Sequence, residues 1–213
     1  MNDLSEASER VMRLVLMLRQ AGATDPQVLA AMERTPREVF APPDCGDLPW
    51  EDVALPLPFG QFSTKPSLIG QILGLAEMAP GCHVLEVGVG SGYQTGVLAL
   101  LARRVVGLER QRGLAMDARE RLGRLRRMQA VVHCADGLEG WPREAPYDRI
   151  LINALLTDAA PFLAQLAGDG ILIAPMVCDG IQRLVRFCSQ NGAIQRSEHQ
   201  ICRFAALLPG CPE

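Results

Sequence analysis

Lysine and long apolar runs are the first things missing from this chain of 213 residues. Only one of its 21 basic residues, Lys65, is a lysine, and the others are all arginines. No stretch approaches the roughly 18 consecutive apolar residues that a membrane-spanning helix needs. The basic residues are outnumbered by 24 acidic ones, and the net charge of −3 offers no bulk attraction to nucleic acid or to anionic membranes. We therefore expect neither nucleic acid nor a membrane as a partner.

Closely spaced cysteines are also missing. The seven cysteines are odd in number and never closer than nine positions apart, which excludes CxxC-type zinc or redox motifs and fits no disulfide framework. The stretch Met1–Glu6 is polar and acidic, unlike a secretory signal. These absences predict no metal site and a reducing, cytoplasmic location.

The composition is that of a globular protein, with 48% hydrophobic and 21% charged residues, and the length suits a single domain over 1–213. Apolar spacing predicts a helix over 4–20, and Thr24-Asp25-Pro26 predicts the start of a second one. The proline-rich stretch 35–66 carries too many apolar side chains for a free linker, so we interpret it as a loop packed on the body. We expect residues 1–65 to form a helical cap and 66–213 a cofactor-binding core.

Strands and helices alternate after a helix that begins at Pro66. The predicted strands are 82–87, 105–109, 130–134, 148–153 and 171–175, and the predicted helices between them are 93–102, 111–127 and 158–167. Such alternation predicts an α/β fold: a doubly wound, mainly parallel sheet with helices on both faces. The last two strands, 183–187 and 199–207, flank a turn at Asn191-Gly192 and are expected to pair as an antiparallel edge of the sheet.

Three glycines at alternate positions, Gly88, Gly90 and Gly92, join the first core strand to the following helix. Glycines here let the backbone approach a nucleotide-like ligand closely and allow a positive φ. Seventeen residues after Gly92 the next strand ends in Glu109, whose carboxylate can accept both hydroxyl hydrogens of a ribose. The sequence therefore predicts a nucleotide-type cofactor site.

The spacing of these glycines decides between two cofactors. Dinucleotide-binding loops follow G-x-G-x-x-G, whereas here the third glycine comes one residue early and Tyr93 occupies the place of the last glycine. The pattern E-x-G-x-G-x-G that begins at Glu86 resembles motif I of the S-adenosylmethionine-dependent methyltransferases. In those enzymes an acid after the third strand contacts the adenine amino group. The residues that this resemblance implies for the cofactor are Glu86, Gly88, Gly90, Gly92, Glu109, Asp136 and Gly137.

Longer stretches carry a more specific resemblance. They are 36–40, 50–56, 60–66, 84–95, 136–141, 145–148 and 203–204, of which Tyr93-Gln94-Thr95 and Asp136-Gly-x-x-Gly-Trp141 are the most particular. Across almost its whole length the chain resembles the protein-L-isoaspartate O-methyltransferase family. The resemblance implies S-adenosylmethionine as cofactor and isoaspartyl residues of damaged proteins or peptides as acceptors. In that family the methyl ester cyclises to a succinimide, which partly reopens as normal aspartate.

Histidines are scarce, and the implied chemistry does not need them. An acceptor carboxylate, with an ordinary pKa near about 4, is already ionised at neutral pH, so methyl transfer requires orientation and no general base. His83 and His133 fall within predicted strands, where a packed structural role is favoured, and His199 carries no interpretation.

The acceptor-side signature of the family, Gly-x-Thr-Ile-Ser-x-Pro, is altered over 60–66. Thr64 occupies the place of the serine that lies beside the transferred methyl and the acceptor, and it keeps a hydroxyl. Phe62 and Ser63 replace the threonine and isoleucine, and Lys65 takes the variable place. The resemblance implies that Thr64 orients the acceptor, with Ser63 and Lys65 beside it. The alternatives are a helix cap for Thr64 and a solvated side chain for Lys65.

Two further acceptor-side segments depart from the family. Leu155 and Leu156 stand where a turn of small residues is usual, so we expect them to narrow or re-shape the acceptor pocket. The family's terminal motif Val-Arg-Phe-Val-Pro-Leu corresponds to residues 202–207 of this chain, which differ from it but retain its arginine as Arg203. Three alternatives therefore remain: another carboxylate acceptor (a dedicated peptide or a small metabolite), cofactor binding without turnover, and, more remotely, a dehydrogenase. The arginine-rich stretch 119–127 is best interpreted as a solvated helix face, and a monomer is favoured.

Overall fold

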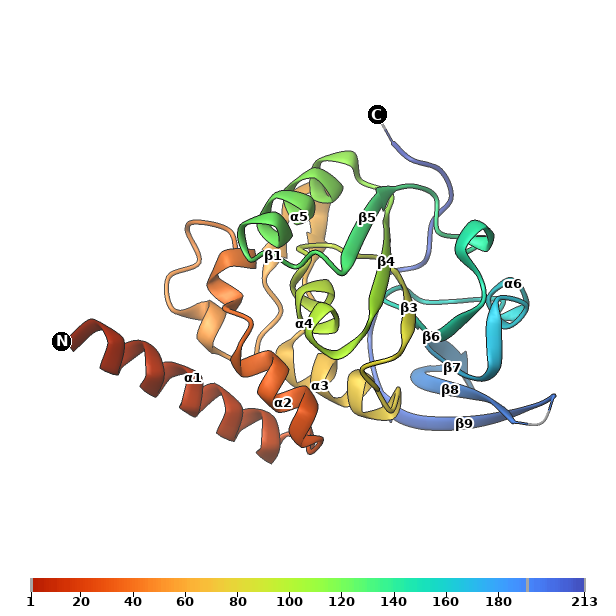
Figure 1. The fold of residues 1–213 in the computed structure, drawn as a ribbon, viewed down its shortest axis with the longest axis horizontal. Coiled ribbons are helices and arrows are strands. Elements are labelled where there is room, and N and C mark those ends of the chain that lie inside the picture. The colour runs from red at the N-terminus through yellow and green to blue at the C-terminus, as the bar shows by residue number, and fades with distance from the viewer. Residues whose placement is uncertain (1, 191, 213) are drawn as a thin grey trace.

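The computed structural model describes residues 2–190 and 192–212, and a seven-stranded sheet runs through their centre (Figure 1). Its order is β5-β4-β3-β6-β7-β8-β9. The strands are β3 His83–Val87, β4 Arg104–Glu109, β5 Ala130–Cys134, β6 Tyr147–Ile152, β7 Leu166–Cys178, β8 Ile181–Gln190 and β9 Ala193–Ile201. All pairs from β5 to β7 are parallel, whereas β8 and β9 are antiparallel additions. The predicted mainly parallel sheet with an antiparallel edge is confirmed.

Helices cover both faces of the sheet, but unequally. The helices are α1 Asn2–Gln20, α2 Pro26–Glu33, α3 Pro66–Leu75, α4 Tyr93–Leu101, α5 Arg112–Arg124 and α6 Ala160–Leu163. Side chains from α1 to α5 form one buried core, and α6 contributes Phe162 to a second core with Leu85 and Tyr147. Figure 1 shows α6 across the sheet from α4 and α5. The sheet is therefore doubly wound, as the alternation of strands and helices predicts.

The start of α2 follows directly from its sequence. The carboxylate of Asp25 accepts the backbone N–H groups of Gln27 at 2.8 Å and Val28 at 3.1 Å, and Pro26 occupies the first helical position. A side-chain cap satisfies donors that have no partner inside the helix, and proline fits where no donor is needed. The predicted helix start is confirmed.

The proline-rich stretch is packed against the body, as predicted, with Phe40 buried in the first core beside Tyr93 of α4. It contains the two-residue strands β1 Pro56–Leu57 and β2 Gln61–Phe62, which pair with each other. Arg37 is only 3% exposed, and its guanidinium donates to four backbone carbonyls of this stretch, including Glu51 at 2.9 Å and Val53 at 2.6 Å. Arg37 thus supplies hydrogen bonds that regular secondary structure would otherwise provide.

Two predicted elements are wrong. The helix expected over 158–167 is only α6, because β7 already begins at Leu166 and pairs there with Tyr147. The last strand lies at 193–201 and not at 199–207. Residues 202–207 are not part of β9, and 205–207 contact Leu155, whose N–H donates to Ala205 O at 2.7 Å and whose carbonyl accepts Leu207 N at 3.0 Å.

The turn predicted at Asn191-Gly192 falls partly outside the described residues, since Asn191 is not among them. β8 and β9, which flank this position, pair antiparallel as expected.

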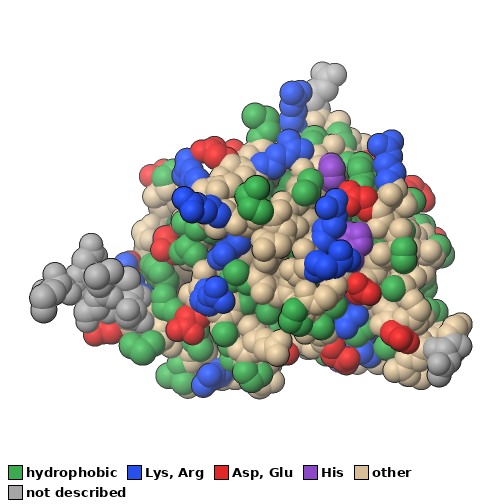
Figure 2. Space-filling view, viewed as in Figure 1, with side chains coloured by type: hydrophobic (Ala, Val, Ile, Leu, Met, Phe, Trp, Pro, Cys, Tyr) green, Lys and Arg blue, Asp and Glu red, His purple; other side chains and the backbone are tan. Residues whose placement is uncertain are grey.

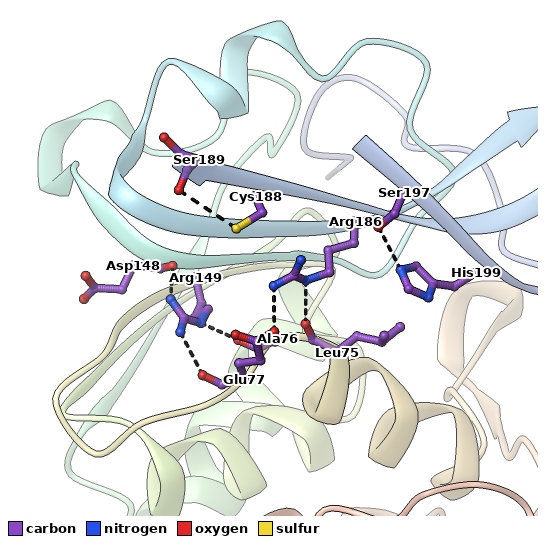
Figure 3. A network of polar contacts seen from close by, with 10 residues as sticks. All are labelled: Leu75, Ala76, Glu77, Asp148, Arg149, Arg186, Cys188, Ser189, Ser197 and His199. Carbon is purple, nitrogen blue, oxygen red and sulfur yellow. Dashed lines mark hydrogen bonds and ion pairs between the residues drawn. The ribbon is translucent and has the colours of Figure 1, made fainter. Parts of the chain in front are cut away.

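Two arginines of the sheet hold the C-terminal end of α3 (Figure 3). Arg149 of β6 donates to the carbonyls of Ala76 and Glu77, and Arg186 of β8 donates to Leu75 O at 3.1 Å and to the Glu77 carboxylate at 2.7 Å. Cations are favourable here because the last carbonyls of a helix lack partners and carry partial negative charge. The network fixes the helix that directly follows the predicted acceptor-side segment.

None of the helices in 2–190 and 192–212 combines the length and apolar content that crossing a bilayer would require.

Candidate active site

The glycine loop lies between β3 and α4 in a backbone conformation that favours glycine. Gly88, Gly90 and Gly92 have φ angles of +85°, +55° and +89°. A Cβ on Gly92 would also lie 3.0 Å from the Cβ of Ala118 in α5. Side chains at these positions would strain the loop, and at Gly92 also separate it from α5. The loop therefore needs its glycines and presents bare backbone to the adjoining cleft.

Glu109 ends β4 beside this loop, and its carboxylate is oriented by backbone donors. One oxygen accepts the N–H of Gly90 at 2.8 Å, and the other accepts the N–H of Gln111 at 2.9 Å. The side chain lines two adjoining clefts, of about 90 and 150 Å³. Each carboxylate oxygen has a second lone pair, so Glu109 can still accept hydroxyl hydrogens from a ligand.

Glu86, by contrast, is fully buried and lines neither cleft. Its carboxyl accepts hydrogen bonds from the Thr95 hydroxyl at 2.6 Å and from Asn153 Nδ2 at 3.2 Å. Burial raises its pKa to about 8, although these hydrogen bonds act in the opposite direction. Glu86 therefore holds the loop and its neighbours in place from behind.

Two residues absent from the sequence-based prediction occupy the centre of the site. Asn153 and Gln61 line both small clefts and also a third, wider groove. Asn153 follows β6 and donates to the carbonyl of Gly88 at 3.1 Å. The signal for Asn153 was its position: β6 lies beside β3, where the strand order reverses, and ligands bind at that point of a doubly wound sheet. Gln61 offered no comparable signal.

Gly137 lines the second cleft, whereas the adjacent Asp136 lines none of the three spaces. A Cβ on Gly137 would come within 2.4 Å of Val87 Cγ1. The Asp136 carboxylate is exposed and accepts the N–H of Leu138 at 2.9 Å and that of Gly210 at 2.5 Å. Arg110 donates to the carbonyl of the same Gly210 at 2.9 Å. The C-terminal segment is thereby held beside the second cleft.

The third groove, of about 1280 Å³, lies on the acceptor side. Ser63, Thr64, Lys65 and Arg203 all line it, so the structure brings these four predicted residues together. Thr64 and Ser63 also line the first small cleft, which contains the glycine loop. Both residues therefore stand where the two spaces adjoin.

Neither Thr64 nor Ser63 caps α3. Asp52 does so by accepting the N–H of Ser67 at 2.7 Å, and its other oxygen lies 3.6 Å from Lys65 Nζ. Ser63 Oγ instead accepts the N–H of Leu55 at 2.9 Å. Within the described part of the chain the Thr64 hydroxyl has no hydrogen-bond partner, which leaves it available to a ligand.

The leucines after β6 do not narrow the acceptor pocket directly. Leu156 is buried in the second core, and Leu155 lines none of the three spaces. The backbone of Leu155 instead carries the hydrogen bonds to 205–207 that bring Arg203 and its neighbours over the site. Leu155 therefore acts on the acceptor side indirectly, by holding the C-terminal segment through its backbone.

Comparison with known sequences agrees with this geometry. A sequence model of the protein-L-isoaspartate(D-aspartate) O-methyltransferase family matches residues 9–210. The chain belongs to this family. It is 40% identical to the protein-L-isoaspartate O-methyltransferase of Maricaulis maris, over 94% of this chain and 95% of that one. The enzyme of Paracoccus denitrificans is 39% identical, over 99% and 98% of the two chains.

Solved structures of the isoaspartate methyltransferase family share the fold. A protein-L-isoaspartate O-methyltransferase superposes with a TM-score of 0.84 at 23% identity, covering 94% of this chain and 67% of that one. A putative enzyme of the family from Plasmodium falciparum, in complex with S-adenosyl-L-homocysteine, gives a TM-score of 0.80 at 23% identity and covers 92% and 96%.

Most side chains of the arginine-rich stretch bind within the protein. Arg119 donates to Val132 O at 2.8 Å, Arg121 to Ser91 O at 3.2 Å and Arg127 to Arg34 O at 3.0 Å, while Arg124 pairs with Glu120. Figure 2 shows cationic and anionic side chains interspersed over one face of the molecule. Arg119 and Arg124 of α5 are nevertheless exposed, as predicted for a solvated helix face.

The histidines lie where packing explains them. His133 stacks on Trp141 with ring centroids 4.7 Å apart, and His83 lies 4.7 Å from the ring of Tyr147. Neither lines any of the three spaces of the site.

Proposed function

We propose that this chain transfers a methyl group from S-adenosylmethionine to the free carboxylate of L-isoaspartyl residues in damaged proteins or peptides. Family membership supports the reaction and the cofactor. The assignment of catalytic roles to particular residues is based on the position of Thr64, which lines both the cleft at the glycine loop and the wide groove.

The residues present fit the cofactor. Gly88 and Gly90 have no side chains and leave bare backbone facing a cleft, and the Glu109 carboxylate is oriented beside it. In our proposal Gly88, Gly90 and Gly92 shape this cleft, Glu109 binds the ribose hydroxyls, and Asp136 with Gly137 bounds the adenine end. Glu86 acts indirectly, by holding the loop. When bound, S-adenosylmethionine supplies an electrophilic methyl group on a sulfonium.

Acceptor orientation falls to Thr64. Its hydroxyl donates to the acceptor carboxylate, whereas Ser63 is occupied by its contact with Leu55. The acceptor carboxylate is already ionised near neutral pH, so no residue of the chain has to remove a proton. Holding it in line with the methyl group is the main catalytic contribution. In this division of labour the cap, residues 1–65, supplies Thr64 and the core, 66–213, supplies the clefts.

A peptide acceptor is favoured over a small metabolite. Small-molecule sites usually enclose about 300–1,000 Å³, whereas the wide groove measures about 1280 Å³ and is open to solvent along exposed side chains such as Phe62 and Ile201. A groove of this size suits several residues of an extended peptide on either side of the modified one.

The deciding experiment compares two peptides of identical composition. We expect base-labile methyl incorporation from labelled S-adenosylmethionine into an isoaspartyl peptide and none into its aspartyl twin. Equal labelling of both peptides would contradict the isoaspartyl assignment. Cofactor binding measured by calorimetry without labelling of either peptide would favour a binding protein without turnover.

The setting of the protein is part of the proposal. All seven cysteines are free thiols, four of them buried, which supports a reducing compartment such as the cytoplasm. We expect the enzyme to act as a monomer, because one chain contributes both the glycine-loop cleft and the acceptor groove.

A further inference from the structure

The wide groove is lined by positive charge and by no negative charge. Lys65 and Arg203 both line it, whereas no aspartate or glutamate does so among residues 2–190 and 192–212. Much of the remaining lining is glutamine or apolar, including the exposed Phe62, Ile181 and Ile201. The groove therefore favours anionic over cationic ligands.

The two cations are neutralised to different degrees. Lys65 Nζ lies 3.6 Å from a carboxylate oxygen of Asp52, and the other oxygen of Asp52 accepts the N–H of Ser67. Arg203 is exposed, and within the described part of the chain it has no ion pair and no hydrogen bond from its guanidinium. Arg203 thus carries most of the uncompensated charge of the groove.

Arg203 is held in place by its neighbours in the chain. Cys202 donates its N–H to Gln182 O at 3.0 Å, and Phe204 donates its N–H to the Gln182 side chain at 2.8 Å. These contacts fix the backbone on both sides of Arg203 against β8. Thr64 and Lys65 belong to a different segment, directly before α3. A peptide bound with its reacting carboxylate at Thr64 can therefore present another side chain to Arg203.

Resting on the proposed function, we infer that the enzyme prefers isoaspartyl peptides that carry a second carboxylate close to the modified residue. Arg203 determines this preference, and Lys65, already paired with Asp52, makes a smaller contribution. A guanidinium can bind a carboxylate through two parallel N–H···O hydrogen bonds. At a solvent-exposed site such a pair is expected to change kcat/KM by about five-fold.

The test uses isoaspartyl peptides that differ at a single position. Glutamate, glutamine or lysine is placed in turn at each of the two positions on either side of the isoaspartyl residue. We expect kcat/KM to follow Glu > Gln > Lys at one or more of these positions, mainly through KM. Raising the salt from about 50 to about 500 mM should reduce the difference, because exposed charge pairs are screened. Fluorescence anisotropy of the same peptides, labelled at one end, measures binding without turnover.

Substitutions in the groove test which residue causes the preference for acidic peptides. Arg203→Gln should reduce the ratio of kcat/KM for the Glu and Lys peptides by about five-fold, and Lys65→Gln should reduce it less. Arg203→Lys keeps the charge but loses the two-bond geometry, so it should retain part of the ratio. The matched control is Arg13→Gln, which removes one positive charge from an exposed position on α1 outside the groove and should leave the ratio unchanged.

The outcomes separate this inference from the function on which it rests. If wild-type enzyme methylates the Glu, Gln and Lys peptides equally well, the charge preference is overturned and the isoaspartyl activity stands. If the ratio survives Arg203→Gln, the role of Arg203 is overturned. If no isoaspartyl peptide is methylated, the proposed function fails, and the anisotropy measurements still decide whether the groove prefers anionic peptides.

Discussion

The hydroxyl of Thr95, in the first turn of α4, donates a 2.6 Å hydrogen bond to the buried carboxyl of Glu86 in β3. The other carboxyl oxygen accepts Asn153 Nδ2 at 3.2 Å, and the same Nδ2 also contacts the carbonyl of Gly88 at 3.1 Å. A strand, a helix, the glycine loop and the residue after β6 are therefore tied together through one acidic side chain. The network fixes the loop through the buried Glu86 and through Asn153, which lines the cleft.

This burial makes stability depend on pH. The pKa of Glu86 is raised to about 8 in the folded protein, from an ordinary value of 4.5. Between these values the folded protein holds a proton that the unfolded chain has released, so the free energy of unfolding falls as the pH rises. Glu86 contributes at most about 1.4 kcal/mol per pH unit in this window. In Glu86→Gln the free energy of unfolding should fall less steeply with rising pH, as measured by urea denaturation between about pH 5.5 and pH 8.

The control for this prediction is Glu139→Gln, which changes an exposed carboxylate outside the network. Its unfolding free energy should follow that of the wild type across the same pH range. Parallel pH profiles for the wild type and Glu86→Gln would show that Glu86 is already ionised in the folded protein.

Glu109→Gln should weaken cofactor binding. The amide would lose the negative charge and would set an NH₂ group against one of the backbone donors that now bind Glu109, from Gly90 and Gln111. We expect the Kd for S-adenosylhomocysteine to rise by about ten-fold or more, measured by calorimetry. Glu120→Gln, on the exposed face of α5, is the matched control and should bind normally. Unchanged affinity in Glu109→Gln would remove Glu109 from the cofactor site.

Thr64→Ala should separate acceptor use from cofactor binding. Without the hydroxyl the acceptor carboxylate is held less accurately, and we expect kcat/KM for an isoaspartyl peptide to fall by about ten-fold or more. The affinity for S-adenosylhomocysteine should change little, and Thr64→Ser should retain most of the activity. Full activity of Thr64→Ala would mean that Thr64 only lines the groove.

Two glycine substitutions should have opposite effects on stability. Gly92 has a φ of +89°, and an added Cβ would lie 3.0 Å from Ala118 Cβ, so Gly92→Ala should cost roughly 1–3 kcal/mol. Gly123, in the last turn of α5, has a negative φ and open space around it. Gly123→Ala should stabilise the protein by up to about 1 kcal/mol. Thermal and urea denaturation measure both, and a neutral Gly92→Ala would show that the loop tolerates a side chain.

Much of the core could be predicted because its signals are local. The glycine loop, the cap at Asp25 and the alternation of strands with helices from β3 to β6 each depend on residues close together in the sequence, and all are present in the structure. Short and weakly patterned elements could not be predicted in the same way. The end of the last strand and the length of α6 depend on pairing with distant partners, such as that of Leu166 with Tyr147.

The candidate active site also has one part that local sequence predicted and another part that it did not. One side of the cofactor cleft is built from one β-loop-α unit and the end of the next strand, so the spacing from Gly88 to Glu109 already indicated that side, whereas residues between 57 and 69 line much of the rest. The acceptor groove is assembled from segments more than a hundred residues apart, which Thr64 and Arg203 represent. Spacing carries no information about whether such segments meet.

The sequence by itself therefore determined the sheet, the glycine loop and the family. The spacing of apolar residues and the need for glycine at positive φ both concern residues that are close together in the sequence. Only the tertiary structure decided that Asn153 and Gln61 stand at the centre of the site, that Leu155 docks the C-terminal segment through its backbone, and that Asp52 caps α3. The single lysine shows the difference: composition isolated it, but its pairing with Asp52 left Arg203 as the main uncompensated charge of the groove. Long-range packing sets which charges are neutralised, and local sequence does not.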